Sequence, residues 1–273
     1  MSSMTSTTTS PAESAVTQDG DVLVLRISDA SKGGALDDAS LKSATTALRE
    51  IARGERQVGA ILLLGAGRNF CAGGNVRDFA AAEHRPTFIR ALADTFHDFV
   101  TALLDADRPV VAGVRGWAAG AGLSIVLHAD IAIGGPSTNL RPAYTGIGLS
   151  PDGGMTWTLP RTVGAARARD IILTDRVITA DEGLAWGILS RLVDDTEIDD
   201  TAAEIARTLA AGPRAGLAAT RALLSGSATA TLRDQLAAEA HAISTNSGSA
   251  EGVEGVDAFV GKRTPDFAAA RER

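Results

Sequence analysis

The stretch RPVVAGVRGWAAGAGLSIVLHADIAIG, residues 108–134, decides the fold of this chain. Its proline ends a helical segment, and the β-branched run VVAGV (110–114) that follows is typical of a buried strand. The glycine-rich GWAAGAG (116–122) then makes a turn, LSIVLHADI (123–131) continues as an apolar helix, and IAIGG (131–135) returns as a strand. Strand, turn, helix and strand in this order predict a crossover connection between parallel strands.

The same order of elements occurs once before, on the N-terminal side. DVLVLRIS (21–28) and AILLLG (60–65) have the composition of strands. Between them, residues 37–53 carry apolar residues at helical spacing, with acidic residues at the start and basic ones near the end. The loop AGRNFCAGGNVRDF (66–79) leads into a long helix that ends before Pro109. We therefore expect an α/β protein with a largely parallel sheet.

The two ends of the chain differ from this alternating middle. The Ser/Thr-rich opening lacks the basic start and apolar core of a secretory signal. From Thr196 onward the sequence is Ala-rich, amphipathic and helical, with no further strand signal. We expect a disordered tail over residues 1–20, a core over 21–195 and a helical C-terminal region over 196–273.

Composition excludes several classes of protein. The net charge of −7 argues against nucleic acid or an anionic membrane as the main partner, since both bind basic surfaces. No apolar run approaches the roughly 18 residues of a membrane-spanning helix. The single cysteine, Cys71, forbids an intramolecular disulfide and predicts a reducing cytoplasm. Four dispersed histidines and one cysteine lack the spacing of a metal site, so we expect none.

Two glycine turns, CAGGNV (71–76) and AAGAGL (118–123), are candidates for binding an oxygen atom. Main-chain N–H groups at such turns, or in the first turn of a helix, have no internal partner and point outward. If the two turns face each other, they hold one carbonyl oxygen between them. The alternative is that each glycine only allows a strand to turn into a helix.

A third turn, GIGLSPDGGMTW (146–157), carries one carboxylate, Asp152. An aspartate in such a place either caps the following helix and shapes the turn or serves as a catalytic group. On the preceding helix, His128 follows Ser124 by four residues, which puts both on one face. The geometry allows a serine with its base, but we favour a polar pair at helix spacing without a catalytic role.

Together these stretches resemble the crotonase superfamily, the enoyl-CoA hydratases and isomerases. The resemblance runs from about residue 21 to 268 and includes EGVDAFVGKRTPDF (254–267) near the end. It implies the crotonase (ClpP/crotonase-like) fold of repeated β-β-α units, with C-terminal helices that assemble a homotrimer or a dimer of trimers. It also implies an acyl-CoA thioester as the substrate, with coenzyme A as part of that substrate and no separate cofactor.

Carried over by position, the resemblance assigns the thioester oxygen to the amides of Gly74 and Ala121. An enolate formed beside the thioester places its charge on that oxygen, and each fixed donor there contributes about 2.7 to 4 kcal/mol. The resemblance also implies contacts with coenzyme A or the acyl group at Lys32, Ala72, Gly73, Val76, Trp117, Phe259 and Lys262.

The reaction depends on which carboxylates are present. Where hydratases carry two glutamates, this chain has Ser124 and Tyr144, whose ordinary pKa values are far from neutrality, about 10 for tyrosine. Asp152 lies where several family isomerases carry a single acid. One carboxylate is enough to move a proton from C2 to C4 of an enoyl-CoA, so we expect a double-bond isomerase.

Three alternatives stay open. His97 precedes Pro109 by twelve residues, which matches the histidine of the 4-chlorobenzoyl-CoA dehalogenase branch. Asp152 then attacks the substrate and His97 activates water, unless His97 only packs on its helix. The second alternative is a hydratase that uses atypical groups, and the third is a CoA-binding or assembly protein without catalysis.

Overall fold

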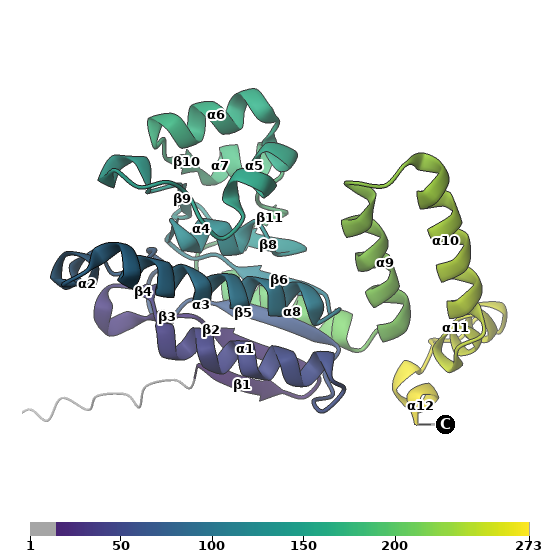
Figure 1. Ribbon diagram of the computed structural model, residues 1–273. Coiled ribbons are helices and arrows are strands. Elements are labelled where there is room, and N and C mark those ends of the chain that lie inside the picture. The colour runs from purple at the N-terminus through teal and green to yellow at the C-terminus, as the bar shows by residue number, and fades with distance from the viewer. Residues whose placement is uncertain (1–14, 273) are drawn as a thin grey trace, which may run out of the picture.

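A six-stranded sheet forms the centre of the computed structural model, which describes residues 15–272 (Figure 1). Its neighbouring strands run parallel, except that β1 is antiparallel to β2. This confirms the α/β class and the largely parallel sheet. The strands, in spatial order, are β1 (Val16–Asp19), β2 (Val22–Arg26), β5 (Ala60–Leu64), β6 (Val110–Gly113), β8 (Ile131–Gly134) and β11 (Arg191–Leu192).

The inner strands β5, β6 and β8 are buried on both faces and carry no polar side chain, whereas the edge strands β1 and β11 are partly exposed. In β5, Ile61 and Leu63 belong to the core beneath α1 (Asp38–Ala52) and α3 (Arg85–Asp105). Leu62 and Leu64 point to the opposite face, which α8 (Ile198–Ala210) covers. Helix α8 is therefore part of the core, and the helical arm begins at α9, one helix later than the boundary predicted at residue 196.

A smaller layer lies beside the central sheet and carries the third turn. Its three-stranded sheet has the order β10-β9-β7, with β9 parallel to β7. The elements of this layer are β7 (Trp117–Ala119), α4 (Ala121–Val126), β9 (Asn139–Arg141), η2 (Thr145–Ile147), α5 (Met155–Val163), α6 (Ala165–Thr174), β10 (Ile178–Thr179) and α7 (Ala180–Ala185). The remaining short elements are β3 (Ser28–Asp29), η1 (Ala30–Lys32), β4 (Ala35–Leu36) and α2 (Val76–Ala81).

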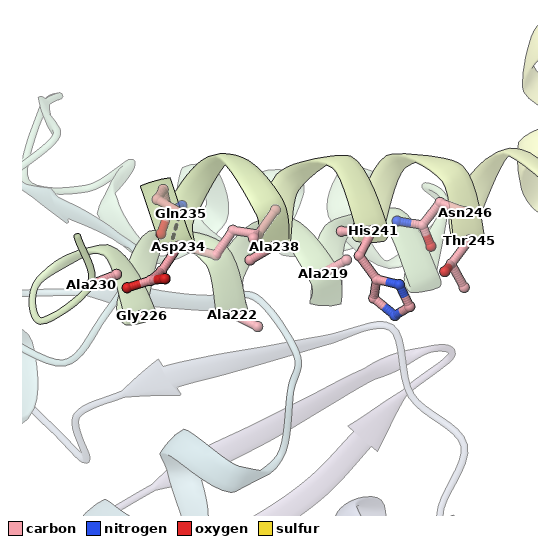
Figure 2. Close-up of a pocket in the computed structure, with 12 residues that line it drawn as sticks. Ala219, Ala222, Gly226, Ala230, Asp234, Gln235, Ala238, His241, Thr245 and Asn246 are labelled. Atoms are coloured by element: carbon pink, nitrogen blue, oxygen red, sulfur yellow. Dashed lines mark hydrogen bonds between the residues drawn. The ribbon is translucent and has the colours of Figure 1, made fainter. Parts of the chain in front are cut away.

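The C-terminal helices extend away from the core as an arm (Figure 1). They are α9 (Arg214–Ser227), α10 (Leu232–Ser247), α11 (Ala250–Val260) and α12 (Phe267–Arg271). The arm is tied to itself by Glu251, which accepts from the Arg214 and Ala215 amides and from Arg271. A hollow of about 540 Å³ lies between α9 and α10. Figure 2 shows residues that line it, which include alanines and polar residues such as His241 and Asn246.

Two further predicted boundaries are wrong. Residues 16–19 were expected in a disordered tail, but they pair with β2 as an antiparallel strand, because a two-residue turn with Gly20 at a φ of +56° folds the chain back. Residues 1–14 of that tail lie outside the described residues. The helix expected over residues 123–131 is α4 and ends at Val126. The chain has to return to β8 beside β6, where the Asp130 amide already donates to Val110. Within residues 15–272, no helix combines the length and apolar character needed to cross a bilayer.

Candidate active site

The two glycine turns lie side by side because the segments that lead into them pair like parallel strands. Cys71 and Ala118 form a parallel bridge, with Cys71 N–H donating to the Trp117 carbonyl at 3.1 Å and Ala119 N–H to the Cys71 carbonyl at 2.8 Å. Gly74 and Ala121 each lie three residues beyond this bridge. Equal steps along parallel chains bring these two residues to the same end of the pair, as the oxyanion-hole hypothesis requires.

Glycine is required where the turns meet. A Cβ on Gly122 would lie 2.2 Å from the Cys71 carbonyl oxygen, and one on Gly73 would lie 3.1 Å from the Ala119 carbonyl oxygen. Gly73 also has a φ of +89°, which side chains with a Cβ rarely adopt. The glycines therefore do more than join a strand to a helix, because they let two main chains approach within contact distance.

The amides of Gly74 and Ala121 are available to a ligand. Their neighbours are already bound: the Ala72 amide donates to Gly34 at 2.7 Å, and the Gly120 amide donates to Arg141 at 3.0 Å. In the part of the chain that the structure describes, neither the Gly74 nor the Ala121 amide donates to a protein acceptor. Two unpaired N–H groups at adjacent turns are the arrangement that holds a developing oxyanion.

Both turns open into one cavity of about 610 Å³. Its walls are largely apolar; Phe79 and Phe88, for example, pack edge to face with 6.4 Å between ring centroids. An apolar cleft with a few converging polar groups is typical of a small-molecule site. The predicted site residues that line it are Lys32, Ala72, Gly73, Gly74, Val76, Ala121, Tyr144 and Asp152.

Asp152 faces this cavity and does not cap a helix. The N-cap of α5 is Gly154, and no side chain caps that helix. The Asp152 carboxylate instead accepts a hydrogen bond from the Tyr144 hydroxyl at 2.6 Å. The capping alternative is therefore wrong, and the carboxylate is placed where it meets whatever enters the cavity.

Tyr144 is a neutral phenol in this setting. Its side chain is almost fully buried, and burial is the main reason why its pKa is raised, followed by the nearby Asp152 charge and hydrogen bond. The preceding residue, Ala143, has a φ of +58° and donates its amide to Asp175 at 2.7 Å. Asp175 also binds Arg141 at 2.8 Å, so the segment that carries Tyr144 is fixed by one carboxylate.

Three other carboxylates line the cavity, and each is already engaged. Asp37 caps α1 by accepting from the Ser40 amide at 2.9 Å. Asp38 pairs with Lys42 at 2.7 Å, and Asp78 accepts from the Asn75 side-chain amide at 2.9 Å. Asp152 differs from these three in its partner, the Tyr144 hydroxyl, which also lines the cavity.

Ser124, His128 and His97 do not line the cavity. Ser124 Oγ donates to the Asp152 carbonyl at 3.0 Å, and His128 Nε2 bonds the Gly153 carbonyl at 2.8 Å. The two therefore do not form a serine–base pair. His97 Nε2 accepts from the Gly153 amide at 3.1 Å. All three residues bind the main chain of the turn that carries Asp152, a role that the sequence did not indicate.

Other predicted contacts lie away from the cavity. Trp117 is 37% exposed on β7, and Phe259 is 85% exposed at the end of α11 on the arm, close in sequence to Lys262. Within one chain none of these three lines the cavity. Lys32 does line it and bridges Asp29 and Asp37 at 3.6 and 3.8 Å.

Cys71 is a packed residue beside the first turn, not a nucleophile. Its side chain is fully buried, and burial raises the pKa of the thiol to about 12. The thiolate, which is the reactive form, is thus suppressed at neutral pH. No group of three or more His, Cys, Asp or Glu side chains in residues 15–272 is arranged to hold a metal ion.

Comparison with known proteins identifies the class to which this fold and site belong. The enoyl-CoA hydratase/isomerase family model matches residues 17–270. The chain is 34% identical to the 1,2-epoxyphenylacetyl-CoA isomerase of Escherichia coli strain K12, covering 90% of this chain and 94% of that protein. It is 37% identical to a "Probable enoyl-CoA hydratase" of Rhodobacter capsulatus, covering 84% and 88%.

A solved structure agrees with these matches. The enoyl-CoA hydratase from Polaromonas sp. JS666 superposes with a TM-score of 0.86 at 29% identity, covering 92% of this chain and 97% of that one. This protein therefore belongs to the enoyl-CoA hydratase/isomerase family and has the crotonase fold, as the sequence resemblance implied.

Proposed function

We propose that this enzyme shifts a double bond within an enoyl-CoA, with Asp152 as the acid and base. One observation carries the proposal: the Asp152 carboxylate, whose Oδ1 accepts from the Tyr144 hydroxyl, shares its cavity with two unpaired main-chain amides. A 1,3-proton shift needs no more than this, one group to move the proton and one site to hold the charge.

With a 3-enoyl-CoA as substrate, the reaction consists of two proton transfers. The thioester oxygen accepts hydrogen bonds from the Gly74 and Ala121 amides. Asp152 takes a proton from C2, so the C2–H bond breaks and its electrons form a dienolate whose charge lies on that oxygen. The same carboxyl then returns the proton at C4, the C3=C4 bond is lost, and the C2=C3 bond remains.

Tyr144 prepares the carboxylate for this exchange. Its hydroxyl binds Oδ1 of Asp152, which leaves Oδ2 to meet the substrate. Lys32 lies at the cavity, where an ammonium group suits the phosphates of coenzyme A. Phe259 and Lys262 reach an acyl-CoA only from a neighbouring chain, which is consistent with the trimer that we propose for the assembled enzyme.

The geometry favours the other reactions less. Hydration by the usual route needs a second carboxylate, and Ser124 in its place is fully buried and bound to the Asp152 carbonyl. Hydrolytic attack by Asp152 needs a base to activate water, but the accepting nitrogen of His97 is occupied by the Gly153 amide. A protein that only binds CoA would not need a carboxylate in the acyl cavity beside two unpaired amides.

The test uses 3-enoyl-CoA and 2-enoyl-CoA in deuterated water with wild type and Asp152→Asn. We expect wild type to isomerise the 3-enoyl-CoA and exchange deuterium, and the variant to lose 10²-fold to 10⁴-fold in rate, the usual contribution of a positioned acid or base. Asp170→Asn, which removes an exposed carboxylate on α6, is the matched control.

Each alternative gives a different result. Hydration that survives Asp152→Asn would support the hydratase. Oxygen from labelled water in the Asp152 side chain would indicate covalent attack. Binding of CoA without turnover of any substrate would support a non-catalytic protein.

A further inference from the structure

The turn that carries Asp152 has one main-chain hydrogen bond of its own, from the Met155 amide to the Asp152 carbonyl at 3.3 Å. Asp152 is followed by Gly153 and Gly154, whose φ angles are +61° and +82°. Glycine reaches this left-handed region without steric cost, but it also has more conformational freedom than any other residue. One bond across two glycines leaves the turn freedom, so groups outside it add to fixing the direction in which the Asp152 side chain leaves the main chain.

Three side chains bind the turn, each at a different polar atom. The Gly153 amide donates to His97 Nε2 at 3.1 Å, and Ser124 Oγ donates to the Asp152 carbonyl at 3.0 Å. His128 Nε2 donates to the Gly153 carbonyl at 2.8 Å. The peptide between Asp152 and Gly153 is thus held at both its N–H and its C=O, and the next peptide is held at its C=O. We term His97, Ser124 and His128 the turn clamp.

The two histidines of the clamp carry their protons on different nitrogens. A main-chain N–H only donates, so His97 presents an unprotonated Nε2 to Gly153. A carbonyl only accepts, so His128 carries a proton on Nε2. Burial lowers the pKa of His128, and the Arg221 charge adds to this although the bond to Gly153 opposes it, so that ring stays neutral.

We propose that His97 and His128 are positioning residues that hold Asp152 against Tyr144 and toward the acyl cavity. Neither ring lines that cavity, so neither touches the acyl group, and each acts through the main chain of the turn. The inference rests on the proposed function for the reaction that it serves. The contacts themselves do not depend on that function.

The first test compares leucine and glutamine variants of the two histidines. His97→Leu and His128→Leu remove the hydrogen bonds, whereas His97→Gln offers an amide oxygen and His128→Gln an amide N–H at a similar reach. Because misplacement by about 1 Å costs up to about 10²-fold, we expect the leucine variants to lose about tenfold to 10²-fold in kcat. KM should change by less than about twofold, since substrate contacts are intact, and glutamine should restore most of the rate.

A matched control is His241→Leu, which removes a histidine on α10 that projects into the hollow of Figure 2, far along the chain from the turn. We expect wild-type kinetics. Thermal unfolding of every variant is measured alongside, so that a loss of folded enzyme is not mistaken for a loss of positioning.

The second test is spectroscopic and does not require turnover. It uses Tyr144, the single tyrosine of the chain. Tyrosine labelled with ¹³C at Cζ gives one resonance from the folded protein. The Asp152→Ala variant lacks the acceptor of the 2.6 Å hydrogen bond, so its spectrum gives the chemical shift of Tyr144 without that bond. We expect the leucine variants to shift the resonance toward that position and the glutamine variants to leave it where wild type has it.

These outcomes separate the two proposals. If wild type does not isomerise 3-enoyl-CoA, the proposed function fails, and the tyrosine resonance still decides whether the clamp holds Asp152. Folded leucine variants with an unmoved resonance would overturn the clamp. If a leucine variant does not fold, ¹⁵N-histidine spectra of wild type decide instead: we expect Nε2 of His97 without a proton and Nε2 of His128 with one, and the reverse would overturn the proposal.

Discussion

Tyr144 and Asp152 lie eight residues apart in sequence, and their side chains meet at 2.6 Å in the wall of the cavity. A hydrogen bond to a charged group is worth about 1.5 to 3 kcal/mol, which corresponds to roughly tenfold to 10²-fold in rate if it is lost from the reacting geometry. The tyrosine is therefore as much a part of the proposed chemistry as the carboxylate that it binds.

We predict that Tyr144→Phe lowers kcat of isomerisation by roughly tenfold to 10²-fold while the fold and the apolar packing persist. The ring is conserved in this substitution, so only the hydroxyl that binds Oδ1 is removed. Steady-state kinetics with 3-enoyl-CoA provides the measurement. An unchanged kcat would mean that Asp152 keeps its place without the phenol.

His128 makes stability depend on pH. Its pKa is lowered from 6.5, mainly by burial, while Arg221, paired with Asp130 at 2.9 Å, adds to the lowering and the bond to Gly153 opposes it. The unfolded chain therefore takes up a proton near pH 6.5 that the folded chain takes up only at lower pH. The free energy of unfolding should fall as pH falls below 6.5, by at most about 1.4 kcal/mol per unit for this group.

This dependence should disappear in His128→Gln, which keeps a donor for the Gly153 carbonyl but does not titrate. Urea unfolding at pH 7.5, 6.5 and 5.5 compares the two proteins. His241→Gln serves as the control because that side chain lies on α10 in the arm. Equal slopes for wild type and His128→Gln would contradict the prediction.

The residues that could be predicted from the sequence are those whose role follows from a local motif. The two glycine turns indicated a site for an oxygen atom, and the family resemblance assigned it to Gly74 and Ala121. The turn at 151–154 drew attention to Asp152 as its one carboxylate. The clamp could not be predicted in this way. His97 and His128 bind the main chain of Gly153, which lies 56 and 25 residues further on, and their positions in the sequence do not indicate this partner.

At the scale of elements, the bridge between Cys71 and Ala118 sets the geometry of the proposed oxyanion hole. It fixes the register of two segments, and that register places the Gly74 and Ala121 amides at the same end of the pair. Gly122 is what lets the segments approach, since a Cβ there would lie 2.2 Å from one main-chain atom of Cys71 and 2.9 Å from its Cβ.

We predict that Gly122→Ala destabilises the protein by at least about 1 to 3 kcal/mol, the usual cost of overpacking, and that the remaining folded enzyme is slow because the two amides are moved apart. Chemical unfolding and kcat are the measurements. Gly226→Ala is the matched control: a Cβ there meets nothing within 4 Å, and alanine in α9 should stabilise by up to about 1 kcal/mol. If Gly122→Ala keeps the stability and kcat of wild type, the two segments tolerate being moved apart and the prediction is wrong.

The long elements were predictable because their own sequences determine them. The strands β2 and β5 of the central sheet are rich in Val, Ile and Leu, and α1 and α3 show helical spacing with clear ends. The small sheet was not found, because β7, β9 and β10 are two or three residues long. Segments of this length become strands only through the strand that they pair with. The local residue pattern does not reveal that pairing.

At the scale of the whole molecule, the arm is the part whose apolar side chains a single chain does not bury. No residue of α10 is buried, and the buried residue of α9 is an arginine. Apolar side chains are exposed along three of its helices, an arrangement that marks a surface for another protein. They are Leu224, Leu232, Leu236, Ile243, Val253, Val256, Phe259 and Val260.

We predict that the arm joins copies of this chain, as the resemblance implied, and that Phe259→Glu disrupts the assembly. Phe259 is the most exposed of these side chains at 85%, and a carboxylate there would have to lose its hydration on assembly. Light scattering after gel filtration should give three or six times the 28.0 kDa chain for wild type and a smaller mass for the variant. Leu173→Glu, on α6 and 73% exposed, is the matched control and should leave the mass unchanged. A monomeric wild type would contradict the prediction, and it would also remove the route by which Phe259 and Lys262 could reach an acyl-CoA.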